Sequence, residues 1–201
     1  MIYPKNKEII VLANGVDENF YNSNLSFNKE FDLVFTGNMS YAPNIDATNF
    51  ISKKLLPELI KSNPKIKILI SGSSPSLKLQ KLQNKNLLIS GWVDDIRESY
   101  LKSNIFIAPM ITGTGMQNKI LEAMALGIPC VTTSLANNAI LAENNKEIII
   151  ANDAKSMLFA IDKLQNDLDF YNLISQNAKK FILENYTWKA VNRELISILE
   201  N

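Results

Sequence analysis

The 201-residue sequence contains no histidine and only one cysteine, Cys130, and both facts limit the chemistry it can perform. Histidine is the side chain that most often acts as general base, metal ligand or pH switch near neutrality. A single cysteine forms no intrachain disulfide, and in an apolar segment we expect it to be a small core residue. Without histidine, a second cysteine or a tight acidic cluster, no zinc site is expected. Binding and catalysis must therefore depend on carboxylates, lysines, hydroxyls, amides and backbone groups.

The sequence also lacks a long hydrophobic run and a marked net charge. Its longest apolar stretches, such as residues 105–111, are far too short to span a bilayer. The opening residues, MIYPKNKE, lack the apolar core of a signal peptide. A formal net charge of +1 gives no overall field that would favour nucleic acid or an anionic membrane. We therefore expect a cytoplasmic protein that does not bind nucleic acid.

Short apolar segments alternate with helical patterns from Phe31 onwards. Six segments are candidate strands, namely residues 33–35, 66–70, 87–89, 105–107, 130–132 and 148–150. They are continuous, rich in β-branched residues and separated by helical patterns, which predicts an α/β fold with a doubly wound, Rossmann-like parallel sheet. Beyond Asn152 three amphipathic patterns follow without a strand, which predicts a C-terminal helical tail.

Local signals add detail to this outline. A helix is predicted from about Asn44, and Pro57 should end or kink it. Asp94 is predicted to cap a helix that runs through Tyr100, and the Asp94-Asp95 pair is interpreted as a cap rather than a metal site. The polar residues 19–30 are interpreted as a linker.

Residues 111–133, ITGTGMQNKILEAMALGIPCVTT, are the strongest candidate for a binding element. A glycine loop leads into a predicted helix over 116–126, which Gly127 ends. Such a helix start presents unpaired N–H groups and the positive end of the helix dipole, and so favours an anion. Lys119 would add a positive charge there, and the side chain of Glu122 would reach the same helix start. The alternative is an ordinary loop, helix and strand joined by a tight turn.

Four of the predicted strands end in loops of small residues. The loops are Gly37-Asn38, Ser71-Gly72-Ser73, Gly91-Trp92 and Gly113-Thr114-Gly115. Because parallel strands end at a common edge and glycine lets backbone approach a ligand, these loops favour a binding crevice there. The sequence has neither a GxGxxG after the first strand nor a GxxxxGK[ST] motif, which disfavours a dinucleotide fingerprint and a P-loop.

Several blocks of the sequence resemble one enzyme family in the same order. GTGMQNKILEAMALGIPCV resembles the signature of the nucleotide-sugar-binding, C-terminal half of retaining GT-B glycosyltransferases of the group 1 (family 4) type. The further blocks are LANGVD, FTGNMSYAPNIDA, ILISGSSP, ISGWVDDIRESYLKSNIFIAPM and NYTWKAVNREL. Together they cover nearly the whole chain. The form GMQNKILEAMA is most similar to bacterial sugar transferases that assemble exopolysaccharide or other surface glycans.

The resemblance implies roles for particular residues. Glu122 matches the second acid of the family's paired-glutamate motif, which binds the ribose hydroxyls, and the backbone at the helix start would hold the diphosphate. The loop at Trp92 would lie beside the base. The implied nucleotide-sugar-binding residues are Gly37, Asn38, Gly72, Trp92, Val93, Gly113, Thr114, Gly115, Met116, Gln117, Asn118, Lys119 and Glu122. No catalytic residue is assigned, and neither a metal nor a cofactor other than the donor substrate is expected.

Two features depart from the family pattern. The first acid of the pair falls at Thr114. The Arg and Lys that usually follow the first strand are replaced by Ser40 and Tyr41. Lys119 is the nearest substitute for their charge, and Arg97 is a weaker one because a solvated helix residue explains it better.

The resemblance also implies a missing half, because the family places its active site between two Rossmann-like domains. Residues 1–30 would then be a remnant strand and linker, 31–185 the donor-binding domain, and 186–201 a helix that crosses back. The expected partners are a nucleoside diphosphate sugar and the N-terminal half or a partner chain, and the isolated chain should show little turnover. An apolar stripe on the last helix predicts weak self-association, and peripheral membrane association through the missing half stays open. The alternatives are a non-catalytic nucleotide-sugar-binding or scaffold domain and half of a GT-B nucleotide-sugar epimerase.

Overall fold

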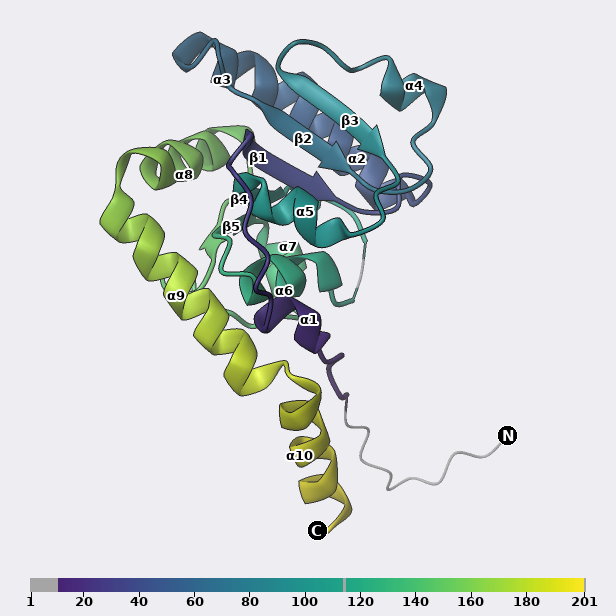
Figure 1. Ribbon diagram of the computed structural model, residues 1–201, viewed down its shortest axis with the longest axis vertical. Helices are drawn as coiled ribbons and strands as arrows, with labels where there is room; N and C mark the ends of the chain where they lie inside the picture. Colours follow the sequence, from purple (N-terminus) through teal and green to yellow (C-terminus); the bar gives the residue numbers. More distant parts are fainter. Residues whose placement is uncertain (1–10, 114, 201) are drawn as a thin grey trace.

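A computed structural model describes residues 11–113 and 115–200 and contains one six-stranded sheet (Figure 1). The strands are β1 (Phe31–Thr36), β2 (Ile68–Ser71), β3 (Leu87–Gly91), β4 (Ser103–Ala108), β5 (Cys130–Thr132) and β6 (Ile149–Ile150). Their order is β3-β2-β1-β4-β5-β6, and every neighbouring pair is parallel. The predicted doubly wound parallel sheet is therefore confirmed.

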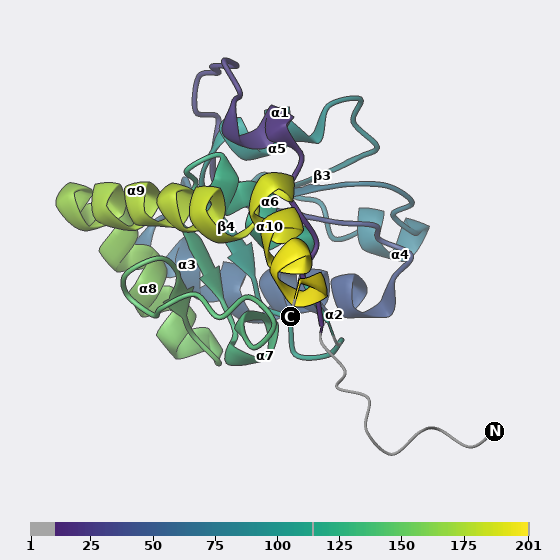
Figure 2. The same ribbon diagram turned by 90° about the horizontal axis from the view of Figure 1, so that it is seen from below.

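Helices cover both faces of the sheet. They are α1 (Glu18–Tyr21), α2 (Ala42–Phe50), the π-helix η1 (Ile51–Leu55), α3 (Leu56–Ser62), α4 (Leu77–Gln80), α5 (Ile96–Leu101), α6 (Asn118–Ala125), α7 (Ser134–Asn137), α8 (Ala154–Asn166), α9 (Leu168–Asn185) and α10 (Trp188–Leu199). On one face α8 packs against η1, in the continuous run of α2, η1 and α3. On the other face α5 and α6 contact the central strands and α9 packs across α6 (Figures 1 and 2).

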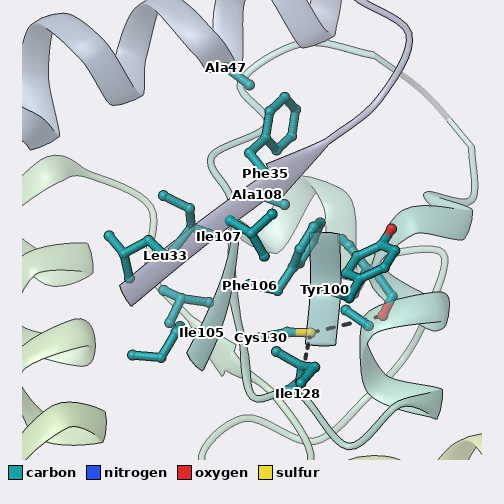
Figure 3. Close-up of a cluster of buried hydrophobic side chains, with 14 of the residues drawn as sticks. Leu33, Phe35, Ala47, Tyr100, Ile105, Phe106, Ile107, Ala108, Ile128 and Cys130 are labelled. Carbon is teal, nitrogen blue, oxygen red and sulfur yellow. Dashed lines mark hydrogen bonds between the residues drawn. The ribbon is translucent and has the colours of Figure 1, made fainter. Parts of the chain in front are cut away.

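The core lies around the two central strands, β1 and β4. Leu33, Phe35, Phe106 and Ile107 are fully shielded from solvent (Figure 3). Strands covered on both faces need apolar side chains at every position rather than at alternate ones, which explains the continuous apolar runs. Cys130 lies in the same core with its thiol 3.3 Å from the carbonyl oxygen of Ile128, as expected for a small core residue.

Pro57 does not end its helix, which continues to Ser62. The proline lies in the first turn of α3, directly after the π-helical turn of η1. In that turn the N–H of Leu56 bonds to the carbonyl of Ile51, five residues earlier. A proline at the start of a new α-helical segment requires no i−4 partner, so the wider turn accommodates it without a break.

Other boundaries also differ from the sequence prediction. The segment interpreted as a linker contains α1, and the helix predicted to begin at residue 116 begins at Asn118. Asp95, not Asp94, caps α5, because Asp95 has the extended backbone of a cap and accepts a bond from the N–H of Arg97. Either aspartate is a good capping residue, so only the path of the chain decides between them.

The two ends of the chain complete the fold. Residues 1–10 of the proposed remnant strand and linker lie outside the described residues, and Val11 is exposed. Helix α10 extends beyond the sheet and its covering helices (Figure 1). Of its apolar stripe, Val191 is buried, whereas Trp188 and Leu195 are exposed. Among the described residues, no helix is both long and apolar enough to cross a membrane.

Candidate functional site

The best-formed candidate site lies where the winding of the sheet reverses. Strands β1 and β4 are neighbours, but the chain winds away from them in opposite directions, so the loops at their carboxyl ends diverge and leave a crevice. A cavity of about 370 Å³ opens at this edge. It is lined by Thr36, Gly37, Gly72, Ser73, Trp92, Val93, Asp94, Ile96, Lys119 and Glu122.

Glycines pack the loops of this edge against one another. A Cβ added to Gly72 would lie 1.9 Å from the carbonyl oxygen of Gly37, and the φ of Gly72 is +140°. The N–H of Gly72 in turn donates to the carbonyl of Gly91 at 2.9 Å. The loops after β1, β2 and β3 therefore form a continuous backbone surface that only glycine permits at this point.

Lys119, in the first turn of α6, points its ammonium toward the loop after β1. Its Nζ donates to Oδ1 of Asn44, and the Nδ2 of Asn44 donates to the carbonyl of Asn38 at 2.8 Å. Nζ also lies 4.7 Å from the centre of the Phe35 ring. Burial lowers the pKa of Lys119 from 10.5 to about 8, and the Glu122 carboxylate opposes this shift. In the described part of the chain no carboxylate forms an ion pair with Lys119, so its charge is left for a ligand.

Glu122 lies one turn further along α6. Its Oε2 accepts a hydrogen bond from the hydroxyl of Tyr100 at 2.8 Å. Burial raises the pKa of Glu122, while the bond from Tyr100 and the charge of Lys119 act against the rise. Glu122 also lines a second cavity of about 280 Å³, together with Asp17, Phe20, Asn118 and others. One carboxylate thus faces two adjoining hollows.

The start of α6 has no side-chain cap. Its N-cap residue, Gln117, makes no capping hydrogen bond. In contrast, side chains cap seven other described helices, through Asp17, Ser76, Asp95, Thr133, Asp153, Asp167 and Thr187. The first N–H groups of a helix have no partner within the helix, so this end favours an external acceptor.

The structure brings together about half of the residues implied by the resemblance. Gly37, Gly72, Trp92, Val93, Lys119 and Glu122 line the first cavity, and Asn118 lines the second. The side chain of Asn38 instead bonds within its own loop, to Ser40. Gly113 packs against Pro43.

The remaining residues implied by the resemblance do not line these cavities. Gly115, Met116 and Gln117 belong to the loop before α6 and line neither. Thr114 lies outside the described residues.

Sequence reasoning missed the two residues that hold the charged groups. Asn44 accepts a hydrogen bond from Lys119, and Tyr100 donates one to Glu122. Both lie within blocks that resemble the family, but the resemblance assigned a role to neither. The signal that identifies them is the burial of a polar group, which becomes visible only in the structure. Asn44 is a buried amide within α2, and Tyr100 carries a hydroxyl at the end of α5 although its side chain is entirely buried. A buried polar group requires a partner, and here the partners are the site residues.

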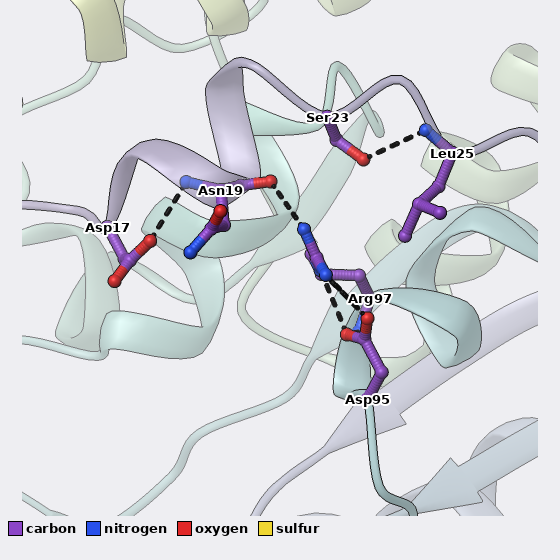
Figure 4. A network of polar contacts seen from close by, with 6 residues as sticks. All are labelled: Asp17, Asn19, Ser23, Leu25, Asp95 and Arg97. Atoms are coloured by element: carbon purple, nitrogen blue, oxygen red, sulfur yellow. Dashed lines mark hydrogen bonds and ion pairs between the residues drawn. The ribbon is translucent and has the colours of Figure 1, made fainter.

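Arg97, the weaker substitute for the missing basic pair, is already paired. Its guanidinium forms a fork with both carboxylate oxygens of Asp95, and Nη1 donates to the carbonyl of Asn19 at 3.0 Å (Figure 4). These bonds join α5 to α1. Arg97 therefore holds the N-terminal segment in place and has no free charge for the cavity.

Two larger hollows lie away from this edge. One of about 680 Å³ lies at the amino ends of the strands, beside Lys29, Asp32 and Asp162. The other, of about 730 Å³, lies beside β6 and α8, next to Phe159 and Phe170. Neither hollow is lined by a residue that the resemblance implies. Neither lies at the carboxyl ends of the strands beside the uncapped start of α6. Convergence of the loops, rather than volume, marks the candidate site.

Comparison with known proteins agrees with this geometry. The family model for glycosyl transferases group 1 matches residues 30–167. The chain belongs to this family. Its parallel sheet and helices are those of one Rossmann-like half of a GT-B glycosyltransferase, as the sequence resemblance implied.

Three similar proteins extend the comparison. An uncharacterised 44.6 kDa protein in the cps region of Klebsiella pneumoniae is 30% identical, over 80% of this chain and 44% of its own length. The UDP-Gal:alpha-D-GlcNAc-diphosphoundecaprenol alpha-1,3-galactosyltransferase of Escherichia coli is 31% identical, over 51% of this chain and 26% of its own. A TarM mutant of S. aureus, solved with UDP, alpha-GlcNAc-glycerol and Fondaparinux, superimposes with a TM-score of 0.77 at 18% identity, over 98% of this chain and 40% of its own. The chain thus spans less than half the length of each.

Proposed function

We propose that the chain is the donor-binding half of a retaining glycosyltransferase that acts in bacterial surface polysaccharide synthesis. The whole enzyme would transfer a sugar from a nucleoside diphosphate to a glycan or another acceptor. Support comes from family membership and from the similar galactosyltransferase, which is named for a UDP-sugar donor. The bound UDP of TarM adds support for a nucleotide ligand.

The site residues suit the parts of such a donor. The base would lie against the loop of Trp92 and Val93, and a ribose diol would donate to the Glu122 carboxylate, which is an acceptor when ionised. The diphosphate would meet the uncapped start of α6 and the ammonium of Lys119. Charge that develops on the departing diphosphate would then be stabilised by helix dipole, backbone N–H groups and Lys119, without a metal.

One observation supports this assignment more than any other. Lys119 and Glu122 are held one turn apart at the edge where the loops after β1, β2 and β3 pack together, and both are partly desolvated without an ion pair between them in the described residues. Charged groups kept in that state are typical of binding sites, because folding alone would favour pairing or exposing them.

Calorimetric titration of the chain with UDP, GDP and ADP tests the proposal. We expect at least one nucleoside diphosphate to bind more tightly than its nucleoside, since both Lys119 and the α6 start act on the diphosphate. Binding of none of the three would contradict the proposal and favour a scaffold domain.

A second candidate is a nucleotide-sugar-binding domain that has lost catalysis. The observation that favours it is Thr114, which stands where the family has the acid that contacts the transferred sugar. Replacing Thr114 with glutamate in a two-domain protein separates the two candidates. An active parent with threonine would reject the second candidate, and activity that appears only with glutamate would support it.

We further propose that the exposed apolar residues of α10, namely Trp188, Leu195, Ile196 and Leu199, pack on the other half of the longer protein. Trp188 and Ile196 are about half exposed, and Leu199 is 75% exposed. An apolar surface of this kind favours a partner or a second copy. Sedimentation at several concentrations should show weak self-association that the cognate N-terminal half abolishes. A clean monomer, with Trp188 shielded from a fluorescence quencher, would contradict this proposal.

A further inference from the structure

The hydroxyl of Tyr100 lies at the centre of a buried hydrogen-bond network. Tyr100 stands in α5, its side chain is entirely buried, and its hydroxyl lies close to three oxygens. These are Oγ1 of Thr36 at 2.7 Å, Oε2 of Glu122 at 2.8 Å and the carbonyl of Lys119 at 3.2 Å. The three partners come from β1 and α6, so the hydroxyl joins three elements at the edge that carries the site.

The direction of these hydrogen bonds follows from the protons available. A phenol has one proton to donate, whereas a carbonyl and an ionised carboxylate only accept. The proton of Tyr100 must therefore point toward Glu122 and the Lys119 carbonyl. Thr36 must then donate its own proton to the oxygen of Tyr100. The chain of donation runs from Thr36 to Tyr100 to Glu122.

The two oxygens of the Glu122 carboxylate therefore differ in their hydrogen bonding. Oε2 is held by Tyr100, whereas Oε1 has no hydrogen-bond partner within the described parts of the chain. We propose that Tyr100 is a positioning residue, which fixes Glu122 through Oε2 and so presents Oε1 to a ribose diol of the donor nucleotide. This inference rests on the proposed function, since it concerns how the ribose-binding carboxylate is held.

The charged surroundings of Glu122 set what a test should measure. Lys119 on its own helix and Tyr100 on α5 both lower its pKa against the effect of burial. Asp17, at the start of α1, and Asp94, before α5, line the two cavities that Glu122 borders. Removing the hydroxyl of Tyr100 leaves all of these charges in place. Any further rise in the Glu122 pKa then reports the hydrogen bond itself.

The experiment compares Tyr100→Phe with Tyr171→Phe. Tyr171 is the matched control, because it also loses a hydroxyl bonded to a carbonyl, that of Asn104 at 2.9 Å, but at the opposite end of the sheet. The pKa of Glu122 is measured without ligand by ¹³C NMR of its carboxyl, with the signal assigned by its loss in Glu122→Gln. UDP affinity is then measured by calorimetry between pH 5 and 8.

Tyr100→Phe should raise the pKa of Glu122 and weaken UDP binding about tenfold at pH 7, the loss typical of a bond to a charged group. As the pH is lowered, the UDP affinity of Tyr100→Phe should begin to fall at a higher pH than that of the wild type, because binding requires the ionised Glu122 carboxylate. Tyr171→Phe should match the wild type in both measurements. An unchanged Glu122 pKa, or full UDP affinity in Tyr100→Phe, would overturn the positioning role.

Thr36 provides a second test if Tyr100→Phe folds poorly. Thr36→Val removes the proton that Thr36 donates and should change both readouts in the same direction but less, whereas Thr36→Ser should restore them. Equal behaviour of the valine and serine variants would also count against the inference. A wild-type chain that binds none of UDP, GDP and ADP would overturn the proposed function and the role toward ribose, while the Glu122 titration would still decide whether the bond exists.

Discussion

Helices α5 and α6 both begin at the carboxyl edge of the sheet, yet the charged residues near their starts are held in opposite ways. At α5, Asp95 caps the helix and pairs with Arg97, which holds the pKa of Asp95 below its usual range. At α6 there is no side-chain cap, and burial raises the pKa of Glu122 and lowers that of Lys119. The charges near the start of α5 form an ion pair within the protein, whereas Lys119 and Glu122 near the start of α6 have only neutral hydrogen-bond partners in the described residues and keep their charges for another molecule.

The difference has a consequence for stability. The lowered pKa of Asp95 means that it stabilises the fold above its unfolded pKa, and that this contribution is lost as the pH falls through its folded pKa. Glu122 has a raised pKa, so its ionisation costs stability as the pH rises past the unfolded value. Lys119 costs stability below a pH of about 8, and the cost disappears as the pH rises toward 10.5. The start of α6 is therefore maintained against the stability of the fold, as is common at functional sites.

The largest effect should come from Glu122→Ala, which removes the proposed acceptor for the ribose. We expect UDP binding to weaken by roughly 1.5–3 kcal/mol, the range for hydrogen bonds to a charged group. Calorimetry is the measurement, and Glu98→Ala on α5 is the control because it removes an exposed carboxylate that pairs, among the described residues, with Lys102. Unchanged affinity for UDP and GDP in a folded Glu122→Ala protein would reject the ribose assignment.

Lys119→Ala should come next, with a loss of about 1.5 kcal/mol that falls on diphosphates more than on the bare nucleoside. The loss should shrink as salt rises, because part of it is Coulombic. Lys102→Ala removes the same charge at the C-cap of α5 and should leave affinity nearly unchanged. An equal loss for nucleoside and diphosphate would show that Lys119 supports the fold rather than the ligand.

At α5 the expected effect is on stability instead of binding. Asp95→Ala removes a helix cap and should lower the free energy of unfolding by about 1 kcal/mol, with UDP affinity little changed. Glu122→Gln at pH 7 should instead be at least as stable as the wild type and should bind UDP more weakly. Urea denaturation of both variants checks the pair. A Glu122→Gln variant that is less stable than the wild type would contradict the proposed difference between the starts of α5 and α6.

The smallest effect should be a pH dependence of diphosphate binding. With its pKa near 8, Lys119 is mostly protonated at pH 7 and loses its charge above pH 8. UDP affinity should therefore fall several-fold between pH 7 and 9, and binding near pH 8.5 should take up a proton. Titrations in buffers of different ionisation enthalpy measure that uptake. In Lys119→Ala the proton uptake should vanish, and its persistence would point to another group.

What the sequence determined by itself was the scaffold. The alternation of short apolar runs with helical patterns specified a parallel sheet, because strands buried on both faces must be apolar throughout. The glycines after the strands marked the edge that carries the site, since only they allow the contact between Gly72 and Gly37. The ordered motifs around Lys119 and Glu122 pointed to the family that comparison confirmed.

Only the tertiary structure decided how the charged groups are held. Lys119 is positioned by Asn44 across 75 residues of sequence, and Glu122 by Tyr100 across 22. No local pattern encodes such a pair, because each partner is an ordinary polar residue until folding buries it beside the other. The same holds for the cap of α5, where Asp94 and Asp95 are equivalent in sequence and the path of the backbone selects Asp95. Local periodicity reports which face of an element is buried, whereas burial of a particular polar pair depends on how distant elements pack.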